Sequence, residues 1–322
     1  MSERANQYGT GRGQAQRGLS LVELMVALVI GTILVGGALT LFVKSKASYR
    51  QNEQINAMQD VSRFSHHVLV SDLRLAGYWG DTNAASSIEG SKDFNPLSTA
   101  VANDCYDYED LGKIVEGSNN ADPYTGAGCI PSSDYQGGTD ILIVRHALPG
   151  KVTTTQKGEV YVRGTSSGGT LFVAGVDDPG SYAGGDVRPA SMTVYYVRPY
   201  TDTPGDNEPC LRMKTLGVSG TTPTMTDQEV ASGVQQFQVQ FGIDTTGDGS
   251  VNEYVNPGNV PSNTTIVAVR FWVLVRADKP DQNYNNNLTY TLAGNTYQFN
   301  DHYRRLLQVD TVQLRNAVIS AQ

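Results

Sequence analysis

The chain has 322 residues, of which only 17% are charged, and a formal net charge of −8. Its 34 glycines and its excess of tyrosine over phenylalanine, 17 against 8, are typical of β-rich proteins outside the cytoplasm. The acidic balance disfavours non-specific binding of nucleic acid by the whole chain, because a polyanion needs a basic face. Three cysteines without a C-x-x-C pair exclude a disulfide-dense scaffold.

The first predicted element is an apolar helix near the N-terminus. Residues 1–18 are polar with a net positive charge, and the apolar segment Leu19–Val43 follows with Glu23 as its single charge. As an α-helix this segment would extend about 37 Å, enough to cross a hydrocarbon core of roughly 30 Å. It is too long for the apolar region of an ordinary cleaved signal peptide. A carboxylate inside such a helix costs about 2.5–3.5 kcal/mol and indicates a functional residue.

The string RGLSLVEL, Arg17–Leu24, resembles the signal of type IV prepilins and of type II secretion pseudopilins. The resemblance implies that a prepilin peptidase cleaves after Gly18 and that Leu19 becomes the methylated N-terminus. It also implies that Glu23, the fifth mature residue, meets the α-amino group of a neighbouring subunit. Removing one partner of such a buried pair costs about 3–5 kcal/mol. Many relatives have Phe where this chain has Leu19, and many have a Pro in the helix, which is absent here up to Ala76.

The helix is predicted to continue beyond the membrane. No Pro or Gly occurs between Lys44 and Ala76, and Gly77 is expected to end the helix. We expect the first half to serve as membrane anchor and assembly rod, and the second half to lie on a sheet. Apolar residues at near-helical spacing predict its buried stripe: Ile55, Met58, Val61, Phe64, Val68 and Leu75.

Two further strings carry a second resemblance. Residues 72–80, DLRLAGYWG, resemble the helix end of the PilW family of minor pilins, although Asp81 stands where a cysteine often follows. Residues 301–316, DHYRRLLQVDTVQLRN, resemble the closing pattern of the same family. The resemblance implies an α+β fold, a pilin-like roll. In this roll one long N-terminal helix packs on an antiparallel β-sheet with long insertions.

Four parts of the chain follow from these observations. They are a cleaved leader (1–18), a transmembrane and assembly helix (19–43), an amphipathic helix half (44–80) and an extracytoplasmic β-rich pilin domain (81–322). Within the last part, residues 81–138 are rich in Asn, Asp, Ser and Gly and lack periodicity. We expect them to form a surface excursion between the helix and the sheet.

Short runs of β-branched and aromatic residues predict the strands. Residues 234–243 alternate apolar residues with glutamine, which predicts a half-buried strand. Residues 266–277 are apolar on both faces, which predicts a central strand. The remaining predicted strands are 139–147, a hairpin of 159–164 with 170–175, and 192–200.

The string DTTGDGSVNE, Asp244–Glu253, matches the start of a calcium loop, with oxygen-bearing side chains at alternate positions before and after a glycine. The bidentate Glu expected at the twelfth position is missing, because Val255 stands there. The alternative is a plain Asp/Gly turn between two strands. Structural calcium is therefore the candidate cofactor, and its candidate ligands are Asp244, Thr246, Asp248, Ser250 and Asn252.

The cysteines Cys105, Cys129 and Cys210 allow three pairings, and the sequence leaves all three open. We favour Cys105–Cys129, because both residues lie in the same polar stretch. A bridge there would stabilise the fold by about 3 kcal/mol in the chain-entropy model.

The sequence offers weak catalytic candidates. The G-x-S-x-G string at 164–168 lies between two predicted strands, whereas a nucleophile elbow lies between a strand and a helix. His66 and His67 are neighbours on the predicted helix and therefore point in different directions. We expect no enzymatic activity.

The favoured function is that of a PilW-like minor pilin in a complex that primes or caps a type IV pilus and supports motility, adhesion or DNA uptake. The chain would be a single-pass inner-membrane protein with a periplasmic domain before it enters the pilus on the cell surface. Its expected partners are other minor and major pilins, the prepilin peptidase and the inner-membrane assembly platform.

Three alternatives remain open. The chain could be a minor pseudopilin of a type II secretion system, or an anchored hydrolase, against which the lack of a convincing triad argues. It could also be a tip adhesin or DNA receptor that binds through residues 81–138. That stretch has only Lys92 and Lys113 as cations, so we expect no direct binding of nucleic acid there.

Overall fold

The computed structural model describes residues 18, 20–82, 87–89, 113–123, 129–176 and 185–317. The chain divides into two compact units, Met1–Asn52 and Glu53–Gln322. One α-helix, α1 (Leu21–Leu75), contributes residues to both units. The predicted long helix that stops before Gly77 is therefore confirmed.

The strands all belong to the second unit. In chain order they are β1 (Ile88–Glu89), β2 (Val115–Ser118), β3 (Ile141–Ala147), β4 (Val160–Thr165), β5 (Gly168–Val173), β6 (Asp186–Arg198), β7 (Cys210–Ser219), β8 (Thr222–Ser232), β9 (Val234–Asp244), β10 (Glu253–Val255), β11 (Thr265–Arg276), β12 (Thr289–Leu292), β13 (Asn295–Gln298) and β14 (Arg305–Gln313).

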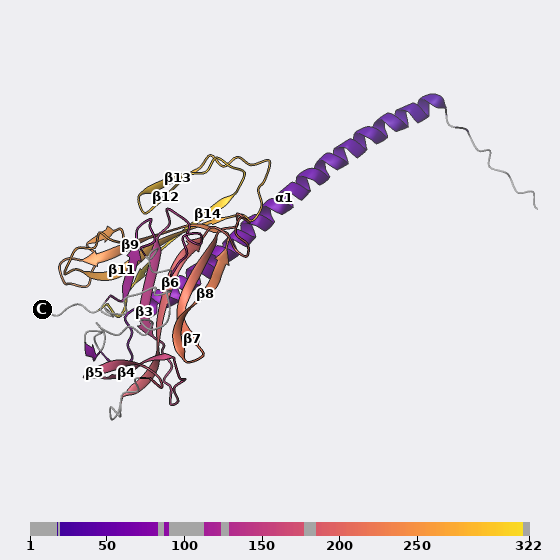
Figure 1. Cartoon of the computed structure of the whole chain (residues 1–322). Coiled ribbons are helices and arrows are strands. Elements are labelled where there is room, and N and C mark those ends of the chain that lie inside the picture. The colour runs from indigo at the N-terminus through magenta and orange to yellow at the C-terminus, as the bar shows by residue number, and fades with distance from the viewer. Residues whose placement is uncertain are drawn as a thin grey trace, which may run out of the picture. The chain divides into compact units, whose positions relative to one another are not determined.

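These strands form three sheets, and β3, β6, β7 and β8 lie side by side in the largest (Figure 1). The eight-stranded sheet has the order β1-β5-β4-β6-β3-β2, and β7 pairs with both β6 and β8. The four-stranded sheet has the order β10-β9-β11-β14, and β12 pairs with β13. The β1–β5 pairing is parallel, and the other pairings among the described strands are antiparallel. The α+β class predicted from the sequence is confirmed.

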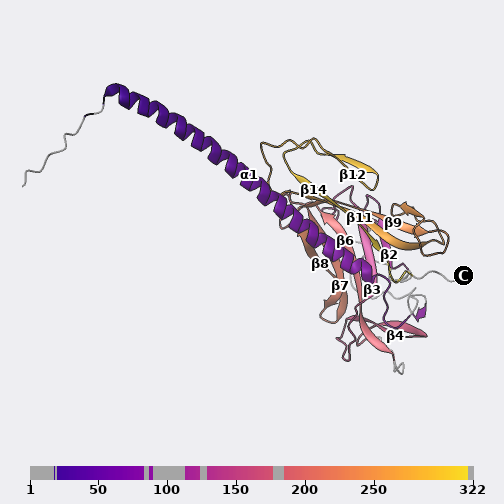
Figure 2. The ribbon, with the colours of Figure 1, turned by 180° about the vertical axis from the view of Figure 1, so that it is seen from behind.

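The C-terminal part of α1, Glu53–Leu75, shares one hydrophobic core with both large sheets. Leu69 and Leu73 of the helix, Leu142 of β3 and Phe237 of β9 are all fully buried in this core. The end of α1 lies close to β3, as both views show (Figure 2). Burial of this face explains why the amphipathic part of the helix folds with the sheets.

The predicted stripe on α1 is partly wrong. Phe64 is 53% exposed, whereas Ser62 and Ser65 are buried against the sheets. Serine is small enough to let the helix approach closely, and Ser65 satisfies its hydroxyl by donating to the Val61 carbonyl at 2.8 Å. The periodicity identified the helix, but it could not distinguish a buried serine from an exposed one. The buried positions are Met58, Ser62, Ser65, Leu69, Val70 and Leu73.

The prediction that residues 234–243 are half buried is also wrong. Gln236 is 7% exposed and Gln238 is fully buried in β9. The Gln238 amide nitrogen donates to Asn120 Oδ1 at 2.9 Å, and its amide oxygen accepts from Asn295 Nδ2 at 3.1 Å. Segments far apart in the chain therefore cover the glutamine face and supply its hydrogen bonds.

The strand predictions succeed where the pattern was strong. The hairpin of β4 and β5 forms with its turn at residues 166–167, and β11 lies between β9 and β14 as a central strand. Strands β7 and β8 were missed, because their threonines, glycine and charged residues give no clear alternation. Both strands form because each makes backbone hydrogen bonds with a neighbouring strand of the sheet.

Candidate functional site

The predicted processing segment lies at the start of α1. Gly18 is exposed, and none of the residues that the structure describes comes within 4 Å of the position that a Cβ would take there. Leu19 lies outside the described residues. An open backbone at Gly18 is what a peptidase needs in order to reach the peptide bond.

Glu23 is exposed in the first turn of α1. Its carboxylate accepts from the Ser20 backbone N–H at 3.4 Å, and Leu24 N–H donates to the Ser20 carbonyl at 3.1 Å. Ser20 and Glu23 thus stand three residues apart, in the arrangement of a capping box. The distance of 3.4 Å between Ser20 N and the Glu23 carboxylate is long for a hydrogen bond, so the carboxylate can still accept from a stronger donor.

The N-terminal part of α1 has the length and composition of a membrane span. It is apolar over a stretch long enough to cross a membrane, and other described residues do not cover this stretch. Large apolar side chains such as Leu21, Leu34 and Leu41 are 67–76% exposed. This surface needs lipid or other helices to cover it.

A second candidate site is the junction where α1 ends. We call it the helix-end junction and define it by Asp72, Ala76, Gly77, Tyr78, His146, Tyr195 and Asn316. It contains both strings that resemble the PilW family, which lie far apart in the sequence. Residues of both strings, Gly77–Gly80 and Arg315–Asn316, also line one open hollow.

Asn316 and β3 complete the end of the helix. The Asn316 amide donates to the Ala76 carbonyl at 3.2 Å, and Gly77 N–H donates to the Arg145 carbonyl of β3 at 2.9 Å. Gly77 has φ +75°, and a Cβ there would come within 2.9 Å of the Asn316 carbonyl oxygen. Glycine is therefore required at this C-terminal position for both its conformation and its close contact.

A polar cluster lies one turn before the helix end. His146 of β3 approaches Asp72 of α1 at 2.7 Å, and Tyr195 of β6 donates to the other Asp72 oxygen at 3.0 Å. Burial and the Asp72 charge raise the pKa of Tyr195 well above its ordinary value, so the phenol remains a donor. Sequence reasoning missed this cluster, whose only signal was a histidine inside an apolar strand.

Two contacts attach α1 to β14. His66 Nε2 lies 2.5 Å from Asp310 Oδ2, and the Ser62 hydroxyl donates to Gln308 at 3.4 Å. His67, the sequence neighbour of His66, is exposed. The two adjacent histidines therefore point in different directions, as predicted.

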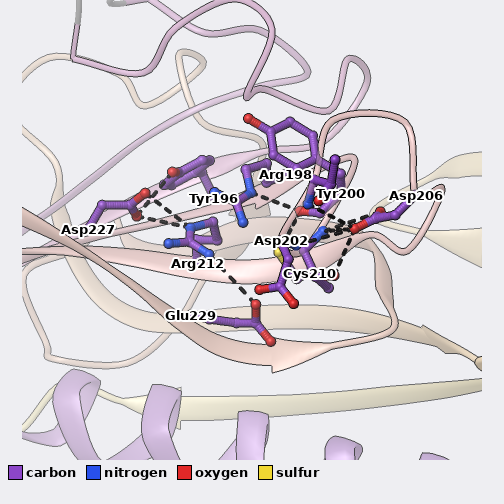
Figure 3. Close-up of polar contacts among 11 residues, drawn as sticks. Tyr196, Arg198, Tyr200, Asp202, Asp206, Cys210, Arg212, Asp227 and Glu229 are labelled. Atoms are coloured by element: carbon purple, nitrogen blue, oxygen red, sulfur yellow. Dashed lines mark hydrogen bonds and ion pairs between the residues drawn. The ribbon is translucent and has the colours of Figure 1, made fainter.

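A polar network joins β6, β7 and β8 (Figure 3). Arg212 Nε donates to both oxygens of Asp227 at 3.1 Å, Tyr196 donates to Asp227 at 3.1 Å, and Glu229 lies 3.7 Å from Arg212. These contacts join β7 to β8 through charged side chains, and they join β6 to the same carboxylate through the Tyr196 hydroxyl.

The loop between β6 and β7 is organised by Asp206. Its carboxylate accepts from the backbone N–H of Glu208 at 2.9 Å and from Thr201 N–H at 3.1 Å. These donors, led by Glu208, lower the pKa of Asp206 to about 2. Burial raises the pKa of Cys210 at the end of this loop to about 11, so its thiol stays protonated and unreactive.

Cys210 is a free, buried thiol. This removes the two pairings that involve it and leaves Cys105–Cys129 as the remaining one. Cys129 is buried, and Cys105 lies outside the described residues. The Cys105–Cys129 bridge stays a prediction.

Of the five predicted calcium ligands, Asp244 is the last residue of β9 and the other four lie in the loop between β9 and β10. Asp244 is 4% exposed and accepts from the N–H groups of Thr246, Gly247 and Gly249 at 2.9, 2.7 and 2.6 Å. Asp248 accepts from Ser250 N–H at 2.8 Å. The loop thus has the hydrogen bonds of an Asp/Gly turn.

Calcium binding by this loop stays a prediction. Asn252 Oδ1 accepts from Thr245 N–H at 2.7 Å, so three of the candidate side chains already serve the turn. Among the residues that the structure describes, no three His, Cys, Asp or Glu side chains gather as a metal-binding group.

Comparisons with known proteins agree with both resemblances. Residues 13–39 match the prokaryotic N-terminal methylation motif, and residues 194–316 match the type IV pilus-assembly protein W family. The second match begins within β6, contains β7 through β14 and ends at Asn316 of the helix-end junction. The chain therefore carries a prepilin signal, which indicates anchoring in a membrane, and a PilW domain. These two matches support a type IV pilus-related pilin.

One solved structure is similar, the type IV-like pilin TTHA1219 from Thermus thermophilus. The identity is 19% and the TM-score 0.26, over 50% of this chain and 86% of that chain. At this TM-score the similarity carries no functional argument. No curated protein matches the chain.

Proposed function

We propose that this chain is a minor pilin that takes part in type IV pilus assembly, in a complex that primes or caps the filament. The observation that carries the proposal is that one chain matches both the methylation motif, at the start of α1, and the PilW family, over residues 194–316. The last residue of the PilW match, Asn316, donates to the Ala76 carbonyl at the end of α1. The role is structural rather than catalytic. It supports pilus biogenesis and, through it, motility, adhesion or DNA uptake.

The proposed mechanism uses the two parts of α1 differently. After cleavage behind Gly18, the α-amino group of Leu19 pairs with Glu23 of a neighbouring pilin in the filament. The N-terminal part of α1 first holds the chain in the inner membrane, with the β-rich domain in the periplasm. The helix-end junction then carries the domain along when the assembly platform extracts the helix, because Asn316 and β3 bind its last turn.

The test is a deletion strain complemented with wild type, Glu23→Ala or Glu23→Gln. We expect wild type to restore surface pili, scored with and without blocked retraction. Glu23→Ala should insert into the membrane at least as well as wild type, because the charge penalty disappears, and should fail to restore pili. Glu23→Gln isolates the charge from the size of the side chain.

Normal piliation with Glu23→Ala would contradict the pairing role. Normal piliation of the deletion strain together with lost protein export would replace the proposal with the alternative of a type II secretion pseudopilin. Normal piliation with lost binding to surfaces would favour the tip adhesin.

A further inference from the structure

One edge of β14 points its backbone groups away from the sheet. β14 is the last strand of the four-stranded sheet and pairs with β11 alone. Just after β14, Leu314 N–H donates to the Val267 carbonyl at 2.8 Å. Just before it, the Arg304 carbonyl accepts from Ala277 N–H at 2.9 Å. Antiparallel hydrogen bonds recur at every second residue, so the even-numbered residues of β14 bond to β11 and the odd-numbered residues point their backbone groups outward.

The outward-pointing residues along most of this edge are Leu307, Val309, Thr311 and Gln313. The Val309 side chain is 44% exposed, and Thr311 and Gln313 are exposed as well. Thr311 N–H donates to the Asp310 carboxylate at 2.7 Å. The residues that the structure describes supply no hydrogen-bond partner for the other three N–H groups or for the four carbonyl oxygens. The edge can therefore bond to an incoming chain.

The other edges among the described strands are protected in ways that β14 is not. β1, β2, β10, β12 and β13 are only two to four residues long. β8 is long, but it contains Pro223, the exposed acids Asp227 and Glu229, and a register shift against β7. Short length, proline, charge and irregular pairing all hinder the addition of a strand. β14 has nine residues without proline or glycine, pairs regularly with β11, and has both of its charged side chains in contact with partners of the same chain.

The spacing of the outward groups specifies the kind of partner. Backbone groups on one side of a strand recur about every 7 Å. Only a second extended polypeptide presents donors and acceptors at that interval along the whole edge. Beside Val309, an apolar or β-branched side chain of the added strand would pack best.

The position of α1 disfavours a second copy of this chain as the partner. Antiparallel pairing of two β14 edges would relate the copies by a two-fold axis normal to the sheet. The C-terminal part of α1 packs on the sheets, so this axis would reverse its direction in the second copy. Subunits that are anchored in one membrane by the same helix have to run in the same direction.

We propose that the outer edge of β14, residues 307–313, docks one extended segment of another pilin-type subunit, which adds to the four-stranded sheet beside β14. The inference deepens the proposed function and rests on it for the identity of the partner. The backbone groups of the edge provide affinity for an extended chain, and Val309 provides a preference among side chains. This contact between subunits is separate from the pairing of Glu23.

The first test is photo-cross-linking of the full chain in its own cells, with p-benzoylphenylalanine in place of Val309. The same substitution at Thr226, an exposed residue on the β8 edge, is the matched control. We expect a cross-link from position 309, several-fold stronger than from position 226, to an extended segment of a protein with its own prepilin signal. No cross-link above the control would overturn the proposal, and so would a cross-link to a second copy or to a protein without that signal.

The second test complements the deletion strain with Val309→Pro, Val309→Lys or Val309→Thr. Proline removes an N–H that faces away from β11, lysine adds a charge at an exposed side chain, and threonine keeps the N–H and the branched shape. We expect surface pili to be lost with proline and lysine and restored with threonine. Denaturant unfolding in micelles verifies that each variant is folded.

Normal piliation with a folded Val309→Lys variant would overturn the docking edge. Normal piliation of the deletion strain itself would instead contradict the proposed function. The cross-link from position 309 then still tests the edge, because pilins and pseudopilins both carry a prepilin signal.

Discussion

The large apolar side chains in the N-terminal part of α1, Leu21–Asn52, are exposed, from 52% at Val26 to 76% at Leu21. In the C-terminal part, Glu53–Leu75, Leu69 and Leu73 are fully buried against the sheets of their own chain. One helical backbone thus serves two environments. The first part needs a membrane or other helices, and the second part is completed by the fold itself. Processing and assembly should therefore depend on the first part, and stability of the domain on the second.

The largest expected effect concerns processing at the start of the first part. Gly18→Phe should block removal of the leader completely, because the peptidase must approach the backbone closely. Intact-mass measurement of the protein from cells with an active prepilin peptidase checks this. Gly13→Phe, another leader glycine, is the control and should be processed normally. Full removal of the leader from the Gly18 variant would refute the assigned site.

The second effect measures the difference between the two parts of α1 directly. Leu69→Ala removes a fully buried side chain and should destabilise the domain by about 2–5 kcal/mol. Leu34→Ala removes a side chain that is 67% exposed and should leave domain unfolding within about 0.5 kcal/mol of wild type. Denaturant unfolding of the full chain in micelles supplies both values. Equal losses would show that the two parts do not differ in this way.

The third effect is a pH dependence of the second unit. Burial raises the pKa of Asp140 to about 6, although the N–H groups of Asn120 and Val239 oppose the shift. The folded state thus binds a proton that the unfolded state releases near pH 4. Stability should fall by about 2–3 kcal/mol as the pH rises from about 4 to about 6.

Asp140→Asn should remove most of that slope, because an amide does not titrate in this range. Midpoints of denaturant unfolding against pH, for wild type and variant, measure it. Parallel profiles would show that Asp140 does not titrate as expected.

The smallest effect belongs to the loop between β9 and β10. If the loop binds calcium, millimolar calcium should stabilise the domain by about 0.4–1.4 kcal/mol, because the ion binds only the folded loop. Thermal unfolding in calcium and in EDTA measures this. Asp248→Ala should abolish the difference, and magnesium should not replace calcium. Asp248 is the better site to change, because Asp244 holds three backbone N–H groups of the turn. Identical curves would leave the loop as a plain turn.

Sequence reasoning succeeded where one local pattern was sufficient. An unbroken helical stretch ending at Gly77 predicted α1, and apolar residues on both faces predicted the central position of β11. The processing residues Gly18 and Leu19 and the assembly residue Glu23 could be proposed because a short signal is read as a linear string, and their roles stay predictions. The candidate calcium ligands were also found as a string, but side-chain oxygens that satisfy a turn and those that bind a cation have the same spacing.

The sequence by itself determined the membrane part of α1, because hydropathy depends on composition alone, and it determined the order of helix before strands. Only the tertiary structure decided that Ser62 and Ser65 are buried while Phe64 is exposed, since that depends on which surface the helix meets. It likewise decided that Gln238 is buried, because Asn120 and Asn295 come from distant segments. The tertiary structure also decided the contacts of the helix-end junction. Asp72, His146 and Asn316 are unremarkable in the sequence, and they act together because the sheets fold around the end of one helix.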